Sequence, residues 1–103
     1  MRESEVEAYL VKRVKELGGG SRKLEWIGRR GAPDQFIALF GAFLVEVKAP
    51  GEKLRPEQER EHLFLRNNGV EVYVVDTIEG VDKLLDSRLP RKKVLFPKPV
   101  TPP

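Results

Sequence analysis

The sequence predicts an α/β domain in which a mixed four-stranded sheet is flanked by helices, in the order α-β-β-β-α-β-α. Three observations support this prediction. Apolar residues recur at helical spacing near both ends of the chain, short apolar runs with strand-like spacing lie between them, and glycines and prolines separate the runs. The 103 residues are expected to form one domain at residues 1–89, followed by a Pro-rich basic tail at residues 90–103.

The first helix is expected over residues 4–17, where valines and leucines recur every three or four positions and form one stripe. Ser4 is a suitable N-cap, and Glu7 stands three residues later, as in a capping box. Glycines 18–20 end this helix and start a loop.

Four strands are expected, three before the second helix and one after it. Gly41 separates the second strand from the third, and so short a connection implies an antiparallel hairpin. Pro56 opens the second helix at its first position, where a missing N–H does no harm. The expected strands are residues 23–27, 34–40, 43–49 and 70–75, and the later helices are residues 56–68 and 79–88.

Charge is unevenly distributed, although the net charge is only +3. All 16 acidic residues precede position 87, whereas residues 88–103 carry basic residues and no acid. A basic tail suits a phosphate backbone, and it equally suits a solubilising chain end. No cysteine is present, which excludes disulfides and thiolate zinc sites. No apolar run approaches the roughly 20 residues that span a bilayer, and the polar N-terminus is unlike a signal peptide. We therefore expect an intracellular protein with no membrane partner.

Glu46 and Lys48 are the strongest chemical signal in the chain. Side chains alternate along a strand, so these two lie on one face of the strand at residues 43–49, beside Leu44. Burying a carboxylate and an ammonium in an apolar strand costs several kcal/mol unless they are paired or bind a metal. A functional site would justify that cost, although the two residues alone could also form a surface salt bridge.

Asp34 is expected to join them. A hairpin around Gly41 pairs positions whose numbers sum to about 82, which places Asp34 near Lys48. Two neighbouring carboxylates repel one another unless a cation lies between them, and Mg²⁺ and Mn²⁺ prefer oxygen ligands. Such an ion polarises a phosphate and activates water, while Lys48 positions that water or stabilises negative charge. The three residues together indicate phosphodiester hydrolysis.

Pro33-Asp34, followed by Glu46-Val47-Lys48 across a hairpin, resembles the PD-(D/E)xK nuclease signature. Within that superfamily, residues 3–86 are similar to a stand-alone VRR-NUC domain, the virus-type replication-repair nuclease. The resemblance implies a restriction-endonuclease-like fold, a Mg²⁺- or Mn²⁺-dependent deoxyribonuclease and 5′-phosphate and 3′-hydroxyl products, and it is consistent with a phage or bacterial origin. The stretches that carry the resemblance are Gly31-Ala32-Pro33-Asp34, Val45-Glu46-Val47-Lys48-Ala49-Pro50-Gly51 and Leu54-Arg55-Pro56-Glu57-Gln58.

The resemblance also implies a glutamate on the first helix and a glutamine on the helix after the Glu-x-Lys strand. Gln58 matches the glutamine. Glu3, Glu5 and Glu7 are candidates for the glutamate, and we choose Glu7 because it lies at the edge of the apolar stripe. By the same resemblance, the metal ligands are Glu7, Asp34, Glu46 and the backbone carbonyl of Val47.

Structural interpretations compete with functional ones at several positions. Glu7 could be only the capping-box carboxylate, and Gln58 could be a solvated helix residue. His62 lies one turn after Gln58 and is expected to be structural rather than a substrate contact. Trp26 is expected in the core rather than as a platform for base stacking.

Arg29 and Arg30 lead directly into Asp34, and we expect them to contact phosphates. Stand-alone members of the family resemble Holliday-junction resolvases, and paired cuts need the two sites of a two-fold dimer. We therefore favour structure-selective cleavage of branched DNA by a homodimer. A general or restriction-like DNA nuclease is the first alternative, and a non-catalytic DNA-binding module is the second.

Overall fold

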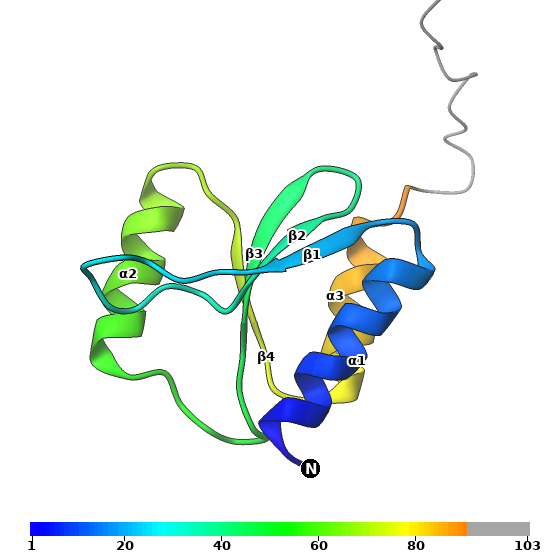
Figure 1. The fold of residues 1–103 in the computed structure, drawn as a ribbon, viewed down its shortest axis with the longest axis horizontal. Coiled ribbons are helices and arrows are strands. Elements are labelled where there is room, and N and C mark those ends of the chain that lie inside the picture. The colour runs from blue at the N-terminus through cyan, green and yellow to red at the C-terminus, as the bar shows by residue number, and fades with distance from the viewer. Residues whose placement is uncertain (91–103) are drawn as a thin grey trace, which may run out of the picture.

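The computed structural model describes residues 1–90, so the expected basic tail lies outside the described residues apart from Pro90. Helices and strands follow one another in the predicted order (Figure 1). They are α1 (Glu3–Glu16), β1 (Gly20–Lys23), β2 (Gln35–Ala38), β3 (Ala42–Val47), α2 (Pro56–Asn67), β4 (Val72–Val75) and α3 (Ile78–Arg88). Within these residues, no helix has the length and apolar character needed to cross a membrane.

A mixed sheet in the order β1-β2-β3-β4 organises the described chain. β1, β2 and β3 pair antiparallel, whereas β3 and β4 run parallel, with α2 between them in the sequence. α1 and α3 lie side by side on one face of the sheet, and α2 lies on the other (Figure 1). The predicted α/β fold, with a mixed four-stranded sheet flanked by helices, is confirmed.

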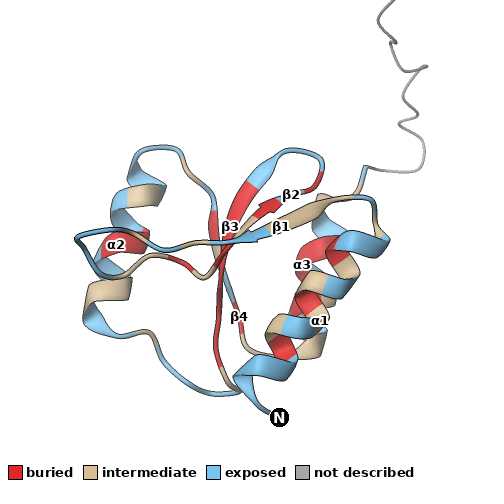
Figure 2. Ribbon diagram, viewed as in Figure 1, coloured by how far each residue is buried: buried red, intermediate tan, exposed pale blue. Residues whose placement is uncertain are grey.

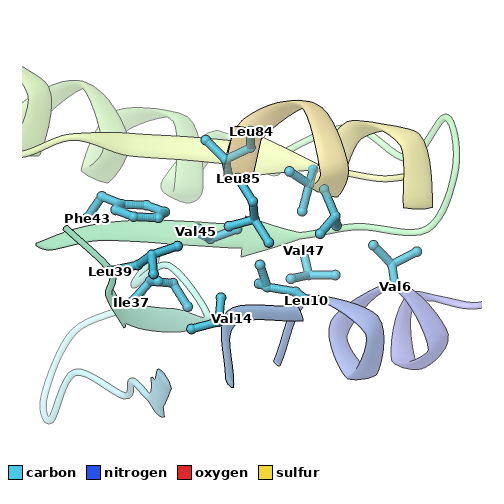
Figure 3. Packing of buried hydrophobic residues seen from close by; sticks show 12 residues of the cluster. Val6, Leu10, Val14, Ile37, Leu39, Phe43, Val45, Val47, Leu84 and Leu85 are labelled. Carbon is cyan, nitrogen blue, oxygen red and sulfur yellow. The ribbon is translucent and has the colours of Figure 1, made fainter. Parts of the chain in front are cut away.

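The apolar core lies between the sheet and the layer formed by α1 and α3. Val6, Leu10 and Val14 are fully buried, as the helical stripe predicts, and they share one cluster with Val45 and Val47 of β3 (Figure 3). β3 is buried along nearly its whole length because helices cover both faces of the sheet (Figure 2). Alternation along β3 therefore directs its valines into this core, and it directs Glu46, with Lys48 just after the strand, towards α2.

The β2–β3 turn sets a register that differs from the predicted one. The turn occupies residues 39–41, where two residues adopt positive φ angles of 49° and 112°. Gln35 pairs with Val45, so the residue before Gln35, Asp34, lies opposite Glu46. The sequence pattern instead predicts Asp34 opposite Lys48, two positions further along the chain, because it centres the turn on Gly41, one residue too late. The correction brings the two carboxylates closer than the sequence pattern indicated.

The first strand is displaced from its expected place at residues 23–27. β1 instead begins at Gly20 and ends at Lys23. Gly19 is needed just before this strand, because a side chain at that position would collide with the carbonyl oxygen of Ala38. Residues 24–34 leave the sheet and cross to α2 as the β1–β2 loop (Figure 1). Pairing with β2 thus outweighs local strand propensity.

Helix α1 begins one residue earlier than expected, and the predicted capping box of Ser4 and Glu7 is wrong. Arg2 is the N-cap, and its backbone N–H donates to Glu5 Oε1 at 2.7 Å. The capping box has the predicted spacing of three residues, but it starts at Arg2 instead of Ser4. Glu7 is therefore free to make contacts with the sheet. The other element boundaries lie within two residues of the predicted ones.

Leu10→Ala should lower the free energy of unfolding by about 3 kcal/mol, because it leaves a cavity in a fully packed core. Leu63→Ala is the matched control, since the side chain of Leu63 is 58% exposed on α2, and it should change the same free energy by about 0.5 kcal/mol or less. Urea unfolding measures both values. Equally small losses would contradict the packing of α1 against the sheet.

Candidate active site

Asp34 stands where the β1–β2 loop rejoins the sheet. Its Oδ2 accepts a hydrogen bond from the Val47 N–H at 2.8 Å, and its backbone carbonyl accepts one from the Leu24 N–H at 2.9 Å. These two bonds fix the carboxylate beside β3, opposite Glu46. One carboxylate oxygen is held by the protein backbone, and the other remains available for a further contact.

Glu46 is only 2% exposed, and its two oxygens have different surroundings. Oε2 accepts a hydrogen bond from Gln58 Nε2 at 3.0 Å and lies 3.7 Å from Lys48 Nζ. Oε1 has no hydrogen-bond partner among the described residues. Glu46 and Lys48 do form an ion pair, but both residues are buried, so the interpretation as a surface salt bridge is wrong. A buried carboxylate oxygen without a donor is an unfavourable arrangement that a cation would relieve.

Burial and charge together raise the pKa of Glu46 from 4.5 to about 7. Burial is the largest cause, the negative charge of Asp34 is the second, and the ammonium of Lys48 opposes both. Without a cation, the carboxyl group of Glu46 is therefore still partly protonated at neutral pH.

Gln58 links the start of α2 to the carboxylate of Glu46. Its Oε1 accepts a hydrogen bond from the Arg55 N–H at 2.9 Å, which completes the N-terminal cap of the helix. The same amide then presents Nε2 to Glu46. The alternative in which Gln58 is a solvated helix residue is therefore wrong. The hydrogen bond thus joins Gln58 to Glu46, and the part that Gln58 has in the reaction stays a prediction.

The candidate glutamates of α1 have different neighbours. Glu7 Oε2 accepts hydrogen bonds from Lys23 Nζ at 2.7 Å and from Gln35 Nε2 at 2.6 Å. Burial alone would raise the pKa of Glu7, but these two bonds outweigh it and hold the pKa below its usual value. Burial and then the negative charge of Asp34 raise the pKa of Glu3. The structure thus places Glu3 in the field of Asp34, while the carboxylate of Glu7 is engaged elsewhere.

The β1–β2 loop is fastened to α2 through Glu61, which is 5% exposed. Glu61 accepts hydrogen bonds from Trp26 Nε1 at 2.7 Å and from Arg29 at 3.1 Å. Trp26 is half-buried in this loop contact, so its expected place in the core is wrong. Arg30 is exposed. Glu61 could not be singled out from the sequence, because it stands among the charged residues of α2 and its pattern is that of a solvated glutamate.

His62 is fully buried and lies 3.9 Å, measured from Nε2, from the unpartnered Oε1 of Glu46. That separation is too long for a hydrogen bond. Burial, followed by the charges of Arg66 and Lys48, lowers the pKa of His62, so its ring is neutral at neutral pH. This burial supports a structural role for His62, because a fully buried ring is not accessible to a substrate.

The donor atoms of this site fit a divalent cation. Asp34 and Glu46 supply carboxylate oxygens on one side of the sheet, and one of these oxygens is buried without a partner. No group of three His, Asp or Glu side chains is already gathered as a metal site in residues 1–90. The expected ligand set with Glu7 is therefore not assembled here, and the role of the Val47 carbonyl stays a prediction.

A hairpin with an aspartate at the start of one strand and Glu-x-Lys on the other, on a mixed sheet flanked by helices, is the core of the PD-(D/E)xK class of nucleases. The VRR-NUC domain model matches residues 22–77. This chain belongs to the VRR-NUC family of nucleases, which confirms the resemblance found in the sequence.

Two relatives agree with this assignment. The protein named “Putative nuclease p44” of Acyrthosiphon pisum secondary endosymbiont phage 1 is 44% identical over 79 residues, which cover 75% of this chain and 85% of the relative. A solved structure described as a VRR-NUC domain has a TM-score of 0.76 and 40% sequence identity, covering 82% of this chain and 94% of that one.

The raised pKa of Glu46 predicts how the stability of the metal-free protein depends on pH. Between pH 4.5 and about 7, the folded state retains a proton that the unfolded chain has lost. The free energy of unfolding should therefore fall as the pH rises through this range and level off above it, as far as this group contributes. Urea unfolding in the presence of a chelator measures the profile. Glu46→Gln should flatten it, and parallel profiles for the variant and the unaltered protein would contradict the assignment.

Proposed function

We propose that this nuclease hydrolyses DNA phosphodiester bonds with Mg²⁺ or Mn²⁺. The observation that carries the proposal is the buried Glu46, which faces Asp34 and has one carboxylate oxygen without a partner among the described residues. Two such carboxylates repel one another unless a cation joins them, and all-oxygen ligation suits these two ions. A DNA-binding module that does not cut has no use for this pair, so we do not favour that alternative.

Each residue of the site has a separate proposed role. Asp34, Glu46 and the carbonyl of Val47 would hold the cation, which when bound polarises a phosphate and makes water more acidic. Lys48, whose Nζ lies 3.7 Å from Glu46 Oε2, positions the attacking water or stabilises the negative charge that develops on the phosphate. Gln58 keeps the carboxylate of Glu46 oriented. The products would carry 5′-phosphate and 3′-hydroxyl ends.

Glu7 is the proposed third carboxylate ligand, and it would have to release Lys23 or Gln35 to reach the cation. Glu3 is the alternative, supported by its electrostatic interaction with Asp34. Glu7→Gln and Glu3→Gln separate the two candidates, because the variant that loses metal-dependent activity identifies the ligand.

Branched DNA is the proposed substrate, and a homodimer is the proposed working form. The described residues form one domain with one such site, whereas paired cuts across a junction need two sites, which a two-fold dimer supplies. Arg30, on the loop that leads to Asp34, would contact phosphates, whereas Arg29 would do so only by sharing or releasing its ion pair with Glu61. A general or restriction-like DNA nuclease is the second candidate, because it would use the same residues. DNA as substrate also supports the expected intracellular location.

Cleavage assays test the proposed reaction. The protein is incubated with a four-way junction, a linear duplex and a single strand, each with Mg²⁺, Mn²⁺ or Ca²⁺. Cutting is expected with Mg²⁺ or Mn²⁺, and Glu46→Ala and Lys48→Ala should each reduce it by roughly 10²-fold or more. Lys12→Gln is the control, since Lys12 is an exposed residue of α1 that pairs with Glu16 and not with a residue of the site.

No cutting of any substrate in any metal would overturn the enzyme proposal. Faster cutting of the junction than of the duplex would support branched DNA as the substrate, and equal rates would leave the general nuclease. Light scattering measures the oligomeric state, and a monomer at the working concentration would contradict paired cleavage.

A further inference from the structure

A cleft of about 400 Å³ lies between the β1–β2 loop and α2. The cleft does not include Asp34, Glu46 or Lys48, but both of its walls lead to them. The loop ends at Asp34, and Gln58, which holds Glu46, lies in the first turn of α2 (Figure 1). The residues that line the cleft are Arg29, Arg30, Glu57, Arg60, Glu61 and Phe64.

The two walls of the cleft are fixed to one another. Buried Glu61 accepts the hydrogen bonds of Trp26 and Arg29 described above. Gly31, at φ +97°, brings the loop so close to α2 that a side chain there would meet the Glu57 carbonyl oxygen at 2.5 Å. Moving the loop away would leave the buried carboxylate of Glu61 without its donors, which is unfavourable. The cleft is therefore a formed feature of the fold.

Two of the three arginines in the cleft are available to a ligand. Arg29 is paired with Glu61 at 3.1 Å. Arg30 and Arg60 are exposed, and neither makes an ion pair or a side-chain hydrogen bond within residues 1–90. Glu57 is the one other carboxylate in the lining. Guanidinium groups present paired donors that match phosphate oxygens, so this cleft favours a phosphate.

Phe64 adds an aromatic surface to the same cleft. It lies one helical turn after Arg60 and is 58% exposed. A guanidinium beside an exposed aromatic ring matches the two parts of a nucleotide, because the charged group binds the phosphate while the ring stacks on a base. The chemistry of the cleft therefore fits a nucleotide of a strand better than a free inorganic anion.

We propose that this cleft binds a phosphate group of the nucleic acid strand away from the bond that is cut. Arg30 and Arg60 bind the phosphate, and Phe64 packs against the adjoining nucleotide. The inference rests on the proposed function, because it takes nucleic acid as the substrate. The phosphate can belong to the interior of the strand or to a 5′ end, and the experiment distinguishes these sources.

Fluorescence anisotropy of a labelled DNA strand, in the presence of a chelator, measures binding separately from cutting. Arg30→Gln and Arg60→Gln should each weaken binding about tenfold. Each should also lower by about one the slope of the logarithm of affinity against the logarithm of salt concentration. Phe64→Ala should weaken binding about tenfold through lost stacking. Lys12→Gln removes an exposed charge from α1, away from the cleft, and should change neither quantity.

The DNA is prepared with a 5′-phosphate and with a 5′-hydroxyl. Equal losses on both strands support an interior phosphate, and losses confined to the phosphorylated strand support a terminal one. Affinities and salt slopes of both arginine variants that match those of Lys12→Gln would overturn the cleft proposal. A failure of the proposed function alone would look different. The unaltered protein would still bind DNA, Arg30→Gln and Arg60→Gln would still weaken that binding, and no DNA would be cut.

Discussion

The pairing of β2 with β3 is the constraint on which the rest of the site depends. It sets Asp34 opposite Glu46, and the hydrogen bond from the Val47 N–H to Asp34 holds that position. A slip of one residue would turn Asp34 to the other face of the sheet and separate the two carboxylates. The turn at residues 39–41 opposes such a slip, because its two positive φ angles close the hairpin at one place.

β3 serves the core and the site at once. Its valines bury themselves against α1 and α3, while Glu46 and Lys48 lie on the face covered by α2. The connection through α2 to the parallel strand β4 brings Gln58 onto that second face. The stability gained from the apolar face offsets the unfavourable burial of charge on the other. The raised pKa of Glu46 is the sign of that burial.

Patterns within single elements predicted much of this structure. The strand alternation that pairs Glu46 with Lys48 and the proline that opens α2 depend on near neighbours, and both are found in the structure. Features that depend on contacts between distant residues could not be predicted in this way. The first strand lies earlier in the chain than predicted because β2 pairs with residues from Gly20 onward. The hydrogen bond from Trp26 to Glu61 likewise joins residues far apart in the sequence. Neither feature leaves a periodic signal in the sequence.

The central claim is that the facing carboxylates form a cation site. Calorimetric titration of the metal-free protein with Mn²⁺ at pH 8 tests it most directly, because Glu46 is then largely ionised. We expect saturable binding that Asp34→Asn and Glu46→Gln each abolish, while Glu61→Gln, which alters a buried carboxylate outside the proposed ligand set, retains it. Absence of binding by the unaltered protein, or equal binding by all variants, would contradict the account.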